Sequence, residues 1–529
     1  MSHSLTEEFG SIRSFIWPIH RHEQRKLVPM LLMLFLICFN YSILRNMKDA
    51  VVVTASGAAV IPFIKFWALL PTAVLLTYVF ARLTNRFSQE RVVYIIISGF
   101  LIFYALFAFV LYPLKDYIHP HALAESLEEA SPDGFYGFIE MCRYWSFTVF
   151  YVLAELWSSI VMTVLFWGIA NEITKIGEAR RFYAMFSIAL NLAGIIAGQA
   201  ANYFSTGGTF NPNLPFGKTG WEQTMMILIS GVIFSGILVM VIFRWMNQNV
   251  LNDPKFEELH SSGRGMKKKQ KLSIRESFSY LSGSKYLICI AIVVVAYNLV
   301  INLVEVVWKD QLSMQYPSPS DYNAYMNNLT TAIGIVSTCT ALFMARMISR
   351  YGWTATAMIT PVILFITSIG FFIFMFFQDS LSGFVFTLFG TTPLALVVFF
   401  GGAQNCLSKA AKYSVFDATK EIAFIPLEHD AKLKGKAAID GVGSRFGKSG
   451  GALIHQGFYV LFGSLTLSSP FIAAILVGVI FFWMYAVRSL GLQFKELVTL
   501  QKKQNSKEVS KEHEEEAVSL PSEEQPATA

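Results

Sequence analysis

The segment IIISGFLIFYALFAFVL, residues 95–111, contains no charged side chain. A run this long and this apolar can cross the hydrocarbon core of a bilayer as an α-helix. It cannot cross as an open strand, because an unpaired sheet edge in lipid leaves backbone N–H and C=O groups without partners. The segment therefore indicates a helical membrane protein.

Similar apolar runs recur along the chain. Of the 529 residues, 54% are hydrophobic and only 15% are charged, whereas soluble domains contain about 25% charged residues. A soluble chain of this length would lack the charges to cover its domain surfaces. We predict an all-α polytopic membrane protein with about twelve transmembrane helices in two six-helix halves, like the major facilitator transporters. The expected spans are residues 28–44, 60–81, 92–112, 144–170, 183–204, 222–243, 286–306, 328–345, 354–377, 383–405, 446–466 and 468–487.

The basic residues support this topology. The loops on one side and the two tails hold 34 of the 42 Lys and Arg, the other side holds six, and the remaining two, Lys65 and Lys448, fall inside expected spans. This positive-inside asymmetry predicts that both termini are cytosolic. Residues 1–27 show no cleavable signal-peptide pattern, so the N-terminus should stay in the cytosol.

Hydrophilic stretches then divide the chain into parts. A central loop with clustered lysines near residue 268 lies between the two halves. We expect this basic loop to be a topology signal; binding of anionic lipid headgroups is the alternative. Short echoes such as Gly194…Gln199 and Gly451…Gln456 occur in the same order in both halves and predict a site between the halves. The expected parts are a cytosolic segment 1–27, a six-helix half 28–245, the cytosolic loop 246–285, a second half 286–490 and a disordered cytosolic tail 491–529.

Charged residues at membrane depth are the main pointers to function, because each costs at least roughly 2.5–3.5 kcal/mol on insertion scales. Glu155 lies deep in the fourth expected span, and Glu305 ends the seventh, where a local ion pair with Lys309 is the structural alternative. Lys65 and Lys448 lie one to two turns inside their spans. These residues predict a polar central cavity for a multiply charged anion.

Three further cations lie at span ends. Arg45 and Lys48 follow the first expected span, and Arg143 precedes the fourth. Snorkelling of these side chains to water is an equally good explanation of their positions. Lys and Arg suit phosphates by charge and by donor geometry. Carboxylates in such a cavity would pair with the lysines when it is empty, or contact the ribose or the adenine amine.

The segment Gly447-Lys448-Ser449-Gly450-Gly451 resembles the end of a phosphate-binding P-loop. However, Val442 occupies the position of the first glycine, and no strand precedes the segment, so it is not a Walker A motif. A helix start with glycines still favours anions, and close helix packing is the alternative explanation of the glycines.

Catalytic and metal-binding patterns are absent from the sequence. There is no His-x-x-x-His zinc pair, no Gly-x-Ser-x-Gly elbow and no Cys-x-x-Cys. We interpret the five cysteines as packing residues. A membrane-bound acyl- or glycosyltransferase would need a catalytic His or Asp near a membrane face; Glu428-His429-Asp430 is the only candidate, and we interpret it as a solvated loop. We therefore expect a transporter without a metal, cofactor or nucleic-acid partner.

At these same residues the sequence resembles the ATP/ADP translocases of plastids and obligate intracellular bacteria, and the chlamydial members most closely. The resemblance covers residues 28–495. It rests on blocks that together are highly specific: Leu44-Arg45-Asn46-Met47-Lys48-Asp49, Ile61-Pro62-Phe63-Ile64-Lys65, Tyr151-Val152-Leu153-Ala154-Glu155-Leu156-Trp157, Leu165-Phe166-Trp167-Gly168, Ile301-Asn302-Leu303-Val304-Glu305-Val306, Leu433-Lys434-Gly435-Lys436-Ala437-Ala438-Ile439-Asp440 and Gly447-Lys448-Ser449-Gly450-Gly451-Ala452-Leu453-Ile454.

The resemblance implies import of ATP in strict exchange for ADP, with phosphate travelling beside ADP, in the inner membrane of a bacterium that lives on host ATP. It assigns roles in transport to Lys48, Glu155, Glu305 and Lys448. We add to the candidate substrate-binding residues Lys65, Arg45, Arg143 and Asn302. The stretch Gly443-Ser444-Arg445-Phe446 departs from the Cys-Asn-Pro-Leu of plastid members and leaves the local shape before Lys448 open.

Two functional hypotheses follow. The first is a monomeric ATP/ADP antiporter that works by alternating access at a central cationic site. The second is a nucleotide transporter of the same fold with broader substrates or proton symport, in which Glu155 or Glu305 would titrate during the cycle. Dependence of uptake on a proton gradient separates the two.

Overall fold

The computed structural model describes residues 17–518 except 18, 175, 206–207, 252–282, 428–434, 437 and 440–442. Every regular element within these ranges is a helix. The lysine cluster of the central loop (Lys267, Lys268, Lys269 and Lys271) and the segment Glu428-His429-Asp430 lie outside the described residues.

The first half consists of six membrane-crossing helices, several of them interrupted by π-helical turns. A hairpin outside the membrane, between the third and fourth crossings, is formed by α7 (Lys115–Ile118), α8 (His121–Ala130), η3 (Asp133–Phe135) and α9 (Tyr136–Arg143). The crossing elements are α3 (Arg21–Ser56), α4 (Val60–Phe63) with η1 (Ile64–Leu69) and α5 (Leu70–Arg86), α6 (Gln89–Leu106) with η2 (Phe107–Leu111), α10 (Trp145–Trp157) with η4 (Ser158–Phe166) and α11 (Trp167–Ile173), α12 (Ile176–Tyr203), and α13 (Gly220–Met246) with η5 (Asn247–Leu251).

The second half repeats this arrangement. Its elements are α16 (Lys285–Gln315), α17 (Pro319–Phe376), α18 (Gln378–Phe389), α19 (Pro393–Ala411) with η6 (Lys412–Phe416) and α20 (Asp417–Phe424), α22 (Ser444–Phe462) and α23 (Leu465–Val518). The long α17 contains two crossings that meet at Gly352, whose φ of 77° and ψ of 171° are not helical.

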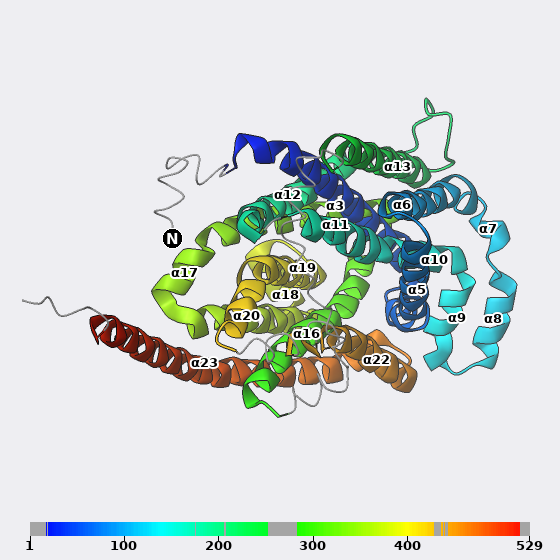
Figure 1. Ribbon diagram of the computed structural model, residues 1–529. Coiled ribbons are helices and arrows are strands. Elements are labelled where there is room, and N and C mark those ends of the chain that lie inside the picture. The colour runs from blue at the N-terminus through cyan, green and yellow to red at the C-terminus, as the bar shows by residue number, and fades with distance from the viewer. Residues whose placement is uncertain are drawn as a thin grey trace, which may run out of the picture.

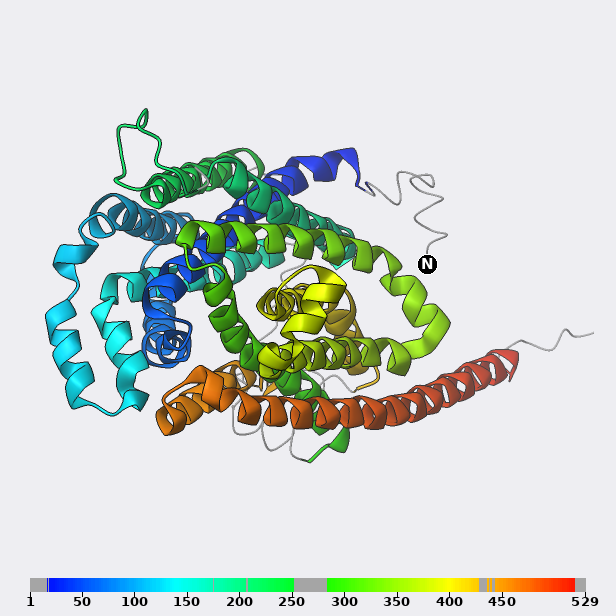
Figure 2. The same ribbon diagram turned by 180° about the vertical axis from the view of Figure 1, so that it is seen from behind.

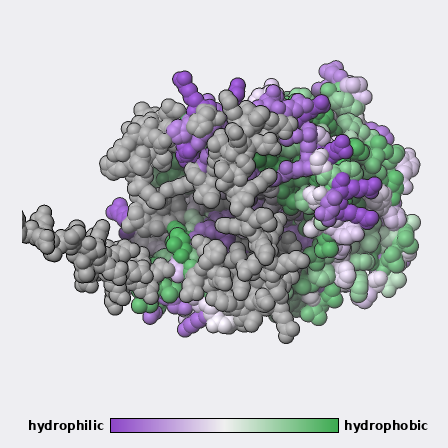
Figure 3. Space-filling view, viewed as in Figure 1, coloured by the Kyte–Doolittle hydropathy of each residue, from purple (hydrophilic) through white to green (hydrophobic). Residues whose placement is uncertain are grey.

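The described helices confirm the expected number of spans. Ten of them are long and apolar enough to cross a membrane. The first part of α17, before Gly352, and the less apolar α22 supply two more crossings and give six in each half. Large apolar side chains such as Leu75, Ile102 and Phe234 are exposed, and hydrophobic residues cover a broad part of the described surface in Figure 3. Soluble monomers rarely expose apolar patches of this extent, so these side chains are suited to lipid contact.

Several of the expected boundaries are wrong. The first helix does not stop at residue 44 but continues through the charged block to Ser56. The expected span 383–405 contains the end of α18, where Gly390 has a φ of 63°, and the crossing helix begins only at Pro393. The expected disordered tail continues α23 as a helix up to Val518, because runs of Glu and Lys are good helix formers.

Both termini of the bundle lie at one end of the molecule. In Figures 1 and 2 the first turns of α3 and the last turns of α23 point to the same side, and α8 and α9 lie at the opposite side. We call these the terminal end and the far end.

The aromatic core of the first half joins its helices: Trp157 of α10 donates a hydrogen bond from Nε1 to the carbonyl oxygen of Ile37 in α3 at 3.0 Å.

π-Helical turns lie next to several of the charged residues in the spans. Lys65 lies inside η1, η4 begins three residues after Glu155, and Lys412 opens η6. A π-turn shifts the side-chain register of the helix that follows it, and such turns are frequent at functional sites. The irregular backbone therefore lies where polar side chains have to face the interior.

Candidate substrate-binding site between the two halves

Six charged side chains form one chain of alternating sign at the centre of the bundle. Glu155 Oε2 lies 3.3 Å from Lys48 Nζ, and Lys48 Nζ lies 2.9 Å from Asp49 Oδ1. Asp49 Oδ2 in turn lies 2.9 Å from Lys309 Nζ. The chain continues from Lys309 Nζ to Glu305 Oε1 at 3.1 Å and from Glu305 Oε2 to Lys65 Nζ at 3.4 Å.

The middle of this charge chain is buried and its ends are open. The side chains of Lys48, Asp49 and Lys309 are 3%, 2% and 1% exposed, whereas that of Glu155 is 33% exposed. The Lys48 ammonium also lies over the Tyr151 ring, 3.7 Å from its centroid. Buried charges persist when each has a partner, so the middle residues hold the structure together while the ends remain available to a ligand.

The charge chain crosses from one half to the other at two places. Asp49 on α3 pairs with Lys309 on α16. Lys65 in η1 pairs with Glu305 on α16 and donates a hydrogen bond to Asn302 Oδ1 at 2.9 Å. The local pair of Glu305 with Lys309 that the sequence suggested does exist, but Glu305 also reaches across the interface.

Further cations lie beside the charge chain on the second half. Lys448 in α22 is exposed, yet Lys412, Glu155 and Lys65 are among the charged groups that act most strongly on it. It therefore lies near the charge chain with its side chain accessible to solvent. Lys409, in the last turn of α19, is subject mainly to the charges of Arg45 and Glu305.

Cations outnumber carboxylates at the centre of the described bundle. Among the described residues at the centre there are seven basic side chains (Arg45, Lys48, Lys65, Lys309, Lys409, Lys412 and Lys448) and three carboxylates (Asp49, Glu155 and Glu305), so basic groups predominate. A concave surface with an excess of one sign concentrates ligands of the opposite sign. The cavity is suited to a polyanion.

Most of the sequence-predicted candidates come together here. Lys48, Lys65, Glu155, Glu305 and Asn302 belong to the charge chain or contact it, and Lys448 lies beside it. Arg45 donates a hydrogen bond from Nη2 to Thr330 Oγ1 at 3.2 Å at the edge of the cavity.

Arg143 is held elsewhere. Its guanidinium pairs with Glu140 at 2.6 Å and with Glu128 at 3.2 Å. These residues belong to α9 and α8, at the far end of the molecule. Arg143 thus joins the two helices of the outer hairpin, and the structure does not bring it to the central charges.

Sequence reasoning missed four members of the site: Asp49, Lys309, Lys409 and Lys412. All four were assigned to loops, or considered only as a neighbour of Glu305, because the apolar windows ended before them. The block that carried Lys48 also contained Asp49, and this adjacency of opposite charges was the available signal.

Polar contacts close the far end of the interface. Asn46 of α3 donates a hydrogen bond from Nδ2 to Asn327 Oδ1 at 2.9 Å. Asn202 of α12 donates from Nδ2 to Asn328 Oδ1 of α17 at 2.7 Å. Gln456 of α22 donates from Nε2 to the carbonyl oxygen of Pro62 at 2.8 Å. Hydrogen bonds of this kind exchange readily with water, so the closed interface can open.

The terminal end of the same interface is open. All four residues of α4 are buried, whereas α5, the continuation of the same crossing toward the terminal end, buries none of its residues. Likewise Phe446 at the start of α22 is 68% exposed, while His455 farther along is fully buried. A bundle helix that packed at both ends would bury one face throughout, so the cavity opens toward the terminal end.

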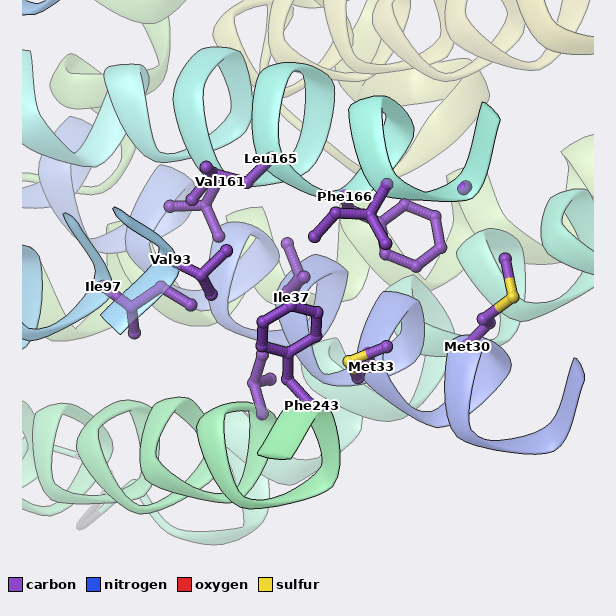
Figure 4. A pocket seen from close by; sticks show the side chains of 12 residues that line it. Met30, Met33, Ile37, Val93, Ile97, Val161, Leu165, Phe166 and Phe243 are labelled. Carbon is purple, nitrogen blue, oxygen red and sulfur yellow. The ribbon is translucent and has the colours of Figure 1, made fainter. Parts of the chain in front are cut away.

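A separate cavity in the first half has a different character. It lies between α3, α6, the η4–α11 segment and α13, and its walls are apolar, with Ile37, Val161 and Phe243 among them (Figure 4). The residues that line it offer no charged group to a nucleotide.

Sequence comparisons with known proteins all point to one family of transporters. The sequence profile of the family described as "TLC ATP/ADP transporter" matches residues 2–494. The chain is 45% identical over 497 residues to ADP,ATP carrier protein 1 of Chlamydia trachomatis serovar D, with 93% of each chain covered. It is 41% identical to ADP,ATP carrier protein 1 of Rickettsia bellii, covering 94% of this chain and 99% of that one. It is 42% identical to the chloroplastic ADP,ATP carrier protein 1 of Arabidopsis thaliana, covering 89% and 74%.

Among solved structures, the fold is similar to a bacterial metal transporter. The TM-score is 0.52 at 10% sequence identity, with 89% of this chain and 98% of the other covered. At this identity the likeness concerns the fold alone. Together with the two six-helix halves, it confirms the expected all-α, major-facilitator-like architecture.

Proposed function

Because this chain belongs to the TLC ATP/ADP transporter family, we propose that it exchanges ATP for ADP across a membrane at the cationic site between its halves. It is a multi-pass membrane protein and a transporter rather than an enzyme. The bacterial relatives support a place in a bacterial inner membrane, with ATP entering the cell.

The observation that carries the proposal is the predominance of basic over acidic side chains among the described residues around the centre of the bundle. ATP carries about four negative charges near neutral pH, since its two inner phosphates contribute one each and its terminal phosphate up to about two. A site in which basic groups predominate suits such a polyanion. Lys448 and Lys65 are in contact with the open space and would meet the phosphates, and the open carboxylate of Glu155 would meet the ribose or the adenine amine.

The cycle that we propose is alternating access of this single site. The polar contacts at the far end would break as those of the terminal end form, and the two halves would rock about the central charges. With both termini in the cytosol, as the distribution of basic residues predicts, the state described here faces the cytosol. We propose that a monomer completes this cycle.

Exchange is obligatory in this scheme because of the surplus cations. Closing the empty cavity brings unneutralised cations of both halves together in a medium of low dielectric constant, which is unfavourable. Bound ATP or ADP neutralises them and lowers this barrier. Phosphate bound beside ADP would restore the charge that ADP lacks relative to ATP, which supports movement of phosphate with ADP.

The decisive experiment measures uptake of labelled ATP into liposomes that contain the purified full-length protein. One batch holds ADP inside and the other holds none. We expect rapid uptake only with internal ADP. Equal uptake in both batches would overturn obligate exchange, and uptake that collapses when a proton gradient is dissipated would favour the alternative, proton-coupled nucleotide symport.

A further inference from the structure

Gln456 of α22 joins the two halves at a point close to Lys65. Its side chain is 9% exposed, and Nε2 donates a hydrogen bond to the carbonyl oxygen of Pro62 at 2.8 Å. Pro62 lies in α4, one helical turn before Lys65, and the π-turn η1 that contains Lys65 begins two residues after it. Inside a membrane, backbone groups beside an irregular turn have to find partners within the protein. Gln456 supplies such a partner from the other half.

A second contact fixes the same turn of α4. The ring of Tyr459, which lies one turn after Gln456 on α22, meets the ring of Phe63 edge to face, with the two centroids 6.2 Å apart. Gln456 and Tyr459 therefore hold α4 at two consecutive residues, Pro62 and Phe63. The backbone that immediately precedes Lys65 is thus placed by α22.

The same segment of α22 also places the helix that carries the acceptors of Lys65. α16 and α22 lie side by side (Figure 1). A Cβ atom at Gly451 would lie 2.8 Å from the Asn302 Cβ, so the absence of a side chain at this position permits the close approach of the two helices. His455 Nε2 lies 3.0 Å from the carbonyl oxygen of Leu303 and donates to it, since a carbonyl group can only accept. α22 therefore contacts both the backbone before Lys65 and the backbone at Asn302.

The contacts of Lys65 leave room for a ligand. Its ammonium group has three N–H donors, and two acceptors on α16 lie close to it: Asn302 Oδ1 at 2.9 Å and Glu305 Oε2 at 3.4 Å. The Asn302 amide is itself oriented, because its Nδ2 donates to the carbonyl oxygen of Asn298 at 2.8 Å and leaves Oδ1 to accept. The Lys65 side chain is 19% exposed. Among the contacts of the described residues, the third donor is left for a ligand oxygen, in a direction that the two acceptors define.

We propose that Gln456 is a positioning residue for substrate binding, which holds Lys65 in place against Asn302 and Glu305 through the carbonyl group of Pro62. This inference rests on the proposed nucleotide exchange, and it concerns a residue that acts on the same site without touching the nucleotide. When the far end opens, α22 and α4 separate and the hydrogen bond of Gln456 breaks. Lys65 then loses its fixed position, so its contribution to nucleotide binding is largest in the state described here.

Gln199 of α12 provides an internal comparison. It follows Gly194 by five residues, as Gln456 follows Gly451. It also donates to the other half, from Nε2 to Thr331 Oγ1 at 2.9 Å. Thr331 belongs to α17, which carries no member of the central charge chain. Loss of the Gln199 amide therefore removes an interface hydrogen bond of the same kind without a connection to Lys65, and Gln199→Met is the matched control.

The test measures dissociation constants for ATP and ADP on the purified full-length protein in detergent, in a double-mutant cycle. The variants are Gln456→Met, which keeps the length of the side chain without its donor, Lys65→Gln, and the two together. A second cycle uses Gln199→Met in place of Gln456→Met. The midpoint of thermal unfolding shows that each protein is folded. Gln456→Asn, whose amide is one methylene too short to reach Pro62, replaces Gln456→Met if that protein does not fold.

We expect Gln456→Met to weaken binding of ATP and ADP about tenfold, and to cause no further loss when Lys65→Gln is also present. Gln199→Met should change binding by the same factor with and without Lys65→Gln, because its hydrogen bond only joins the halves. Unchanged dissociation constants in Gln456→Met overturn the positioning role. So does an equal weakening with and without Lys65→Gln, which a shift between the two open states would produce. A wild-type protein that neither binds nor exchanges ATP and ADP would instead overturn the proposed function.

Discussion

Asp49 Oδ2 and Lys309 Nζ lie 2.9 Å apart, although 260 residues separate them in the sequence, and both side chains are almost completely buried. Asp49 belongs to the first helix of one half and Lys309 to the first helix of the other. Asp49 also pairs with Lys48 through its second oxygen. One carboxylate thus connects the two halves at the centre of the interface that transport has to rearrange.

We predict that Asp49→Asn destabilises the protein. The change removes the negative charge that Lys48 and Lys309 share, and loss of one partner of a buried ion pair costs about 3–5 kcal/mol. Because Lys309 retains Glu305 and Lys48 retains Glu155, we expect the lower end of this range. The midpoint of thermal unfolding in detergent and the rate of ATP/ADP exchange should both fall.

The control for this prediction is the double variant Asp49→Asn/Lys309→Met. It removes both charges of the pair and replaces the buried lysine with an apolar side chain of similar length, so it should recover part of the lost stability. A single variant that unfolds at the wild-type temperature would show that the Asp49–Lys309 pair does not hold the halves together.

We predict that Lys448→Ala, unlike Asp49→Asn, abolishes transport without lowering stability. The Lys448 side chain is exposed to the cavity and has no carboxylate within ion-pair distance among the described residues. Lys448→Ala therefore leaves no buried charge unpaired, and stability should change by no more than about 0.5 kcal/mol. Binding of ATP should weaken and exchange should be lost. ATP affinity and exchange rate equal to the wild type would remove Lys448 from the site.

Hydropathy and isolated charges in the sequence predict much of the fold and part of the site. Glu155 and Lys65 stand out because each interrupts an apolar run, and both lie in the central charge chain. Asp49 and Lys309 do not stand out in this way. They follow the apolar runs directly, where a water-exposed loop is the simplest interpretation, and their pairing across the two halves cannot be read from the local sequence.

The same limit explains the misplaced helix boundaries and Arg143. α3 continues through Arg45 and Lys48 to Ser56 because carboxylates and hydroxyls far away in the sequence satisfy these cations. Arg143 precedes a span just as Arg45 follows one, yet it faces the outer hairpin. Local sequence gives the distance of a charge from an apolar run, but the partner of that charge depends on tertiary packing.

Gly198 provides a test of closure at the far end. A Cβ atom at this position would lie 2.4 Å from the carbonyl oxygen of Asn327 and 2.4 Å from Thr331 Oγ1, closer than real Cβ contacts. We predict that Gly198→Ala prevents α12 and α17 from closing and slows exchange. Gly231→Ala is the control, because a Cβ there meets nothing within 4 Å.

The opening can be followed with an introduced cysteine. Asn323, near the start of α17, is 2% exposed in the closed far end. In a background with the exposed Cys142 and Cys339 replaced by serine, Asn323→Cys should react faster with a membrane-impermeant thiol reagent when Gly198→Ala is also present. Equal labelling rates with and without Gly198→Ala would contradict a role of this glycine in closure.

The outer hairpin should make stability depend on pH. Glu140 and Glu128 share the single guanidinium of Arg143, and burial raises the pKa of Glu140 to about 7, against the opposing effect of Arg143. Between the ordinary pKa of 4.5 and about 7, the folded protein therefore holds a proton that the unfolded chain has lost. Stability falls with rising pH wherever the folded state binds more protons.

We therefore predict that the wild-type protein unfolds at a lower temperature at pH 7.5 than at pH 5. Glu140→Gln carries no titrating group at this position and should remove this part of the pH dependence. Its gain in stability relative to the wild type should be larger at pH 7.5 than at pH 5. Glu129→Gln, at an exposed position on α8, is the control and should keep the wild-type slope. The same slope in Glu140→Gln as in the wild type would mean that Glu140 does not hold this proton.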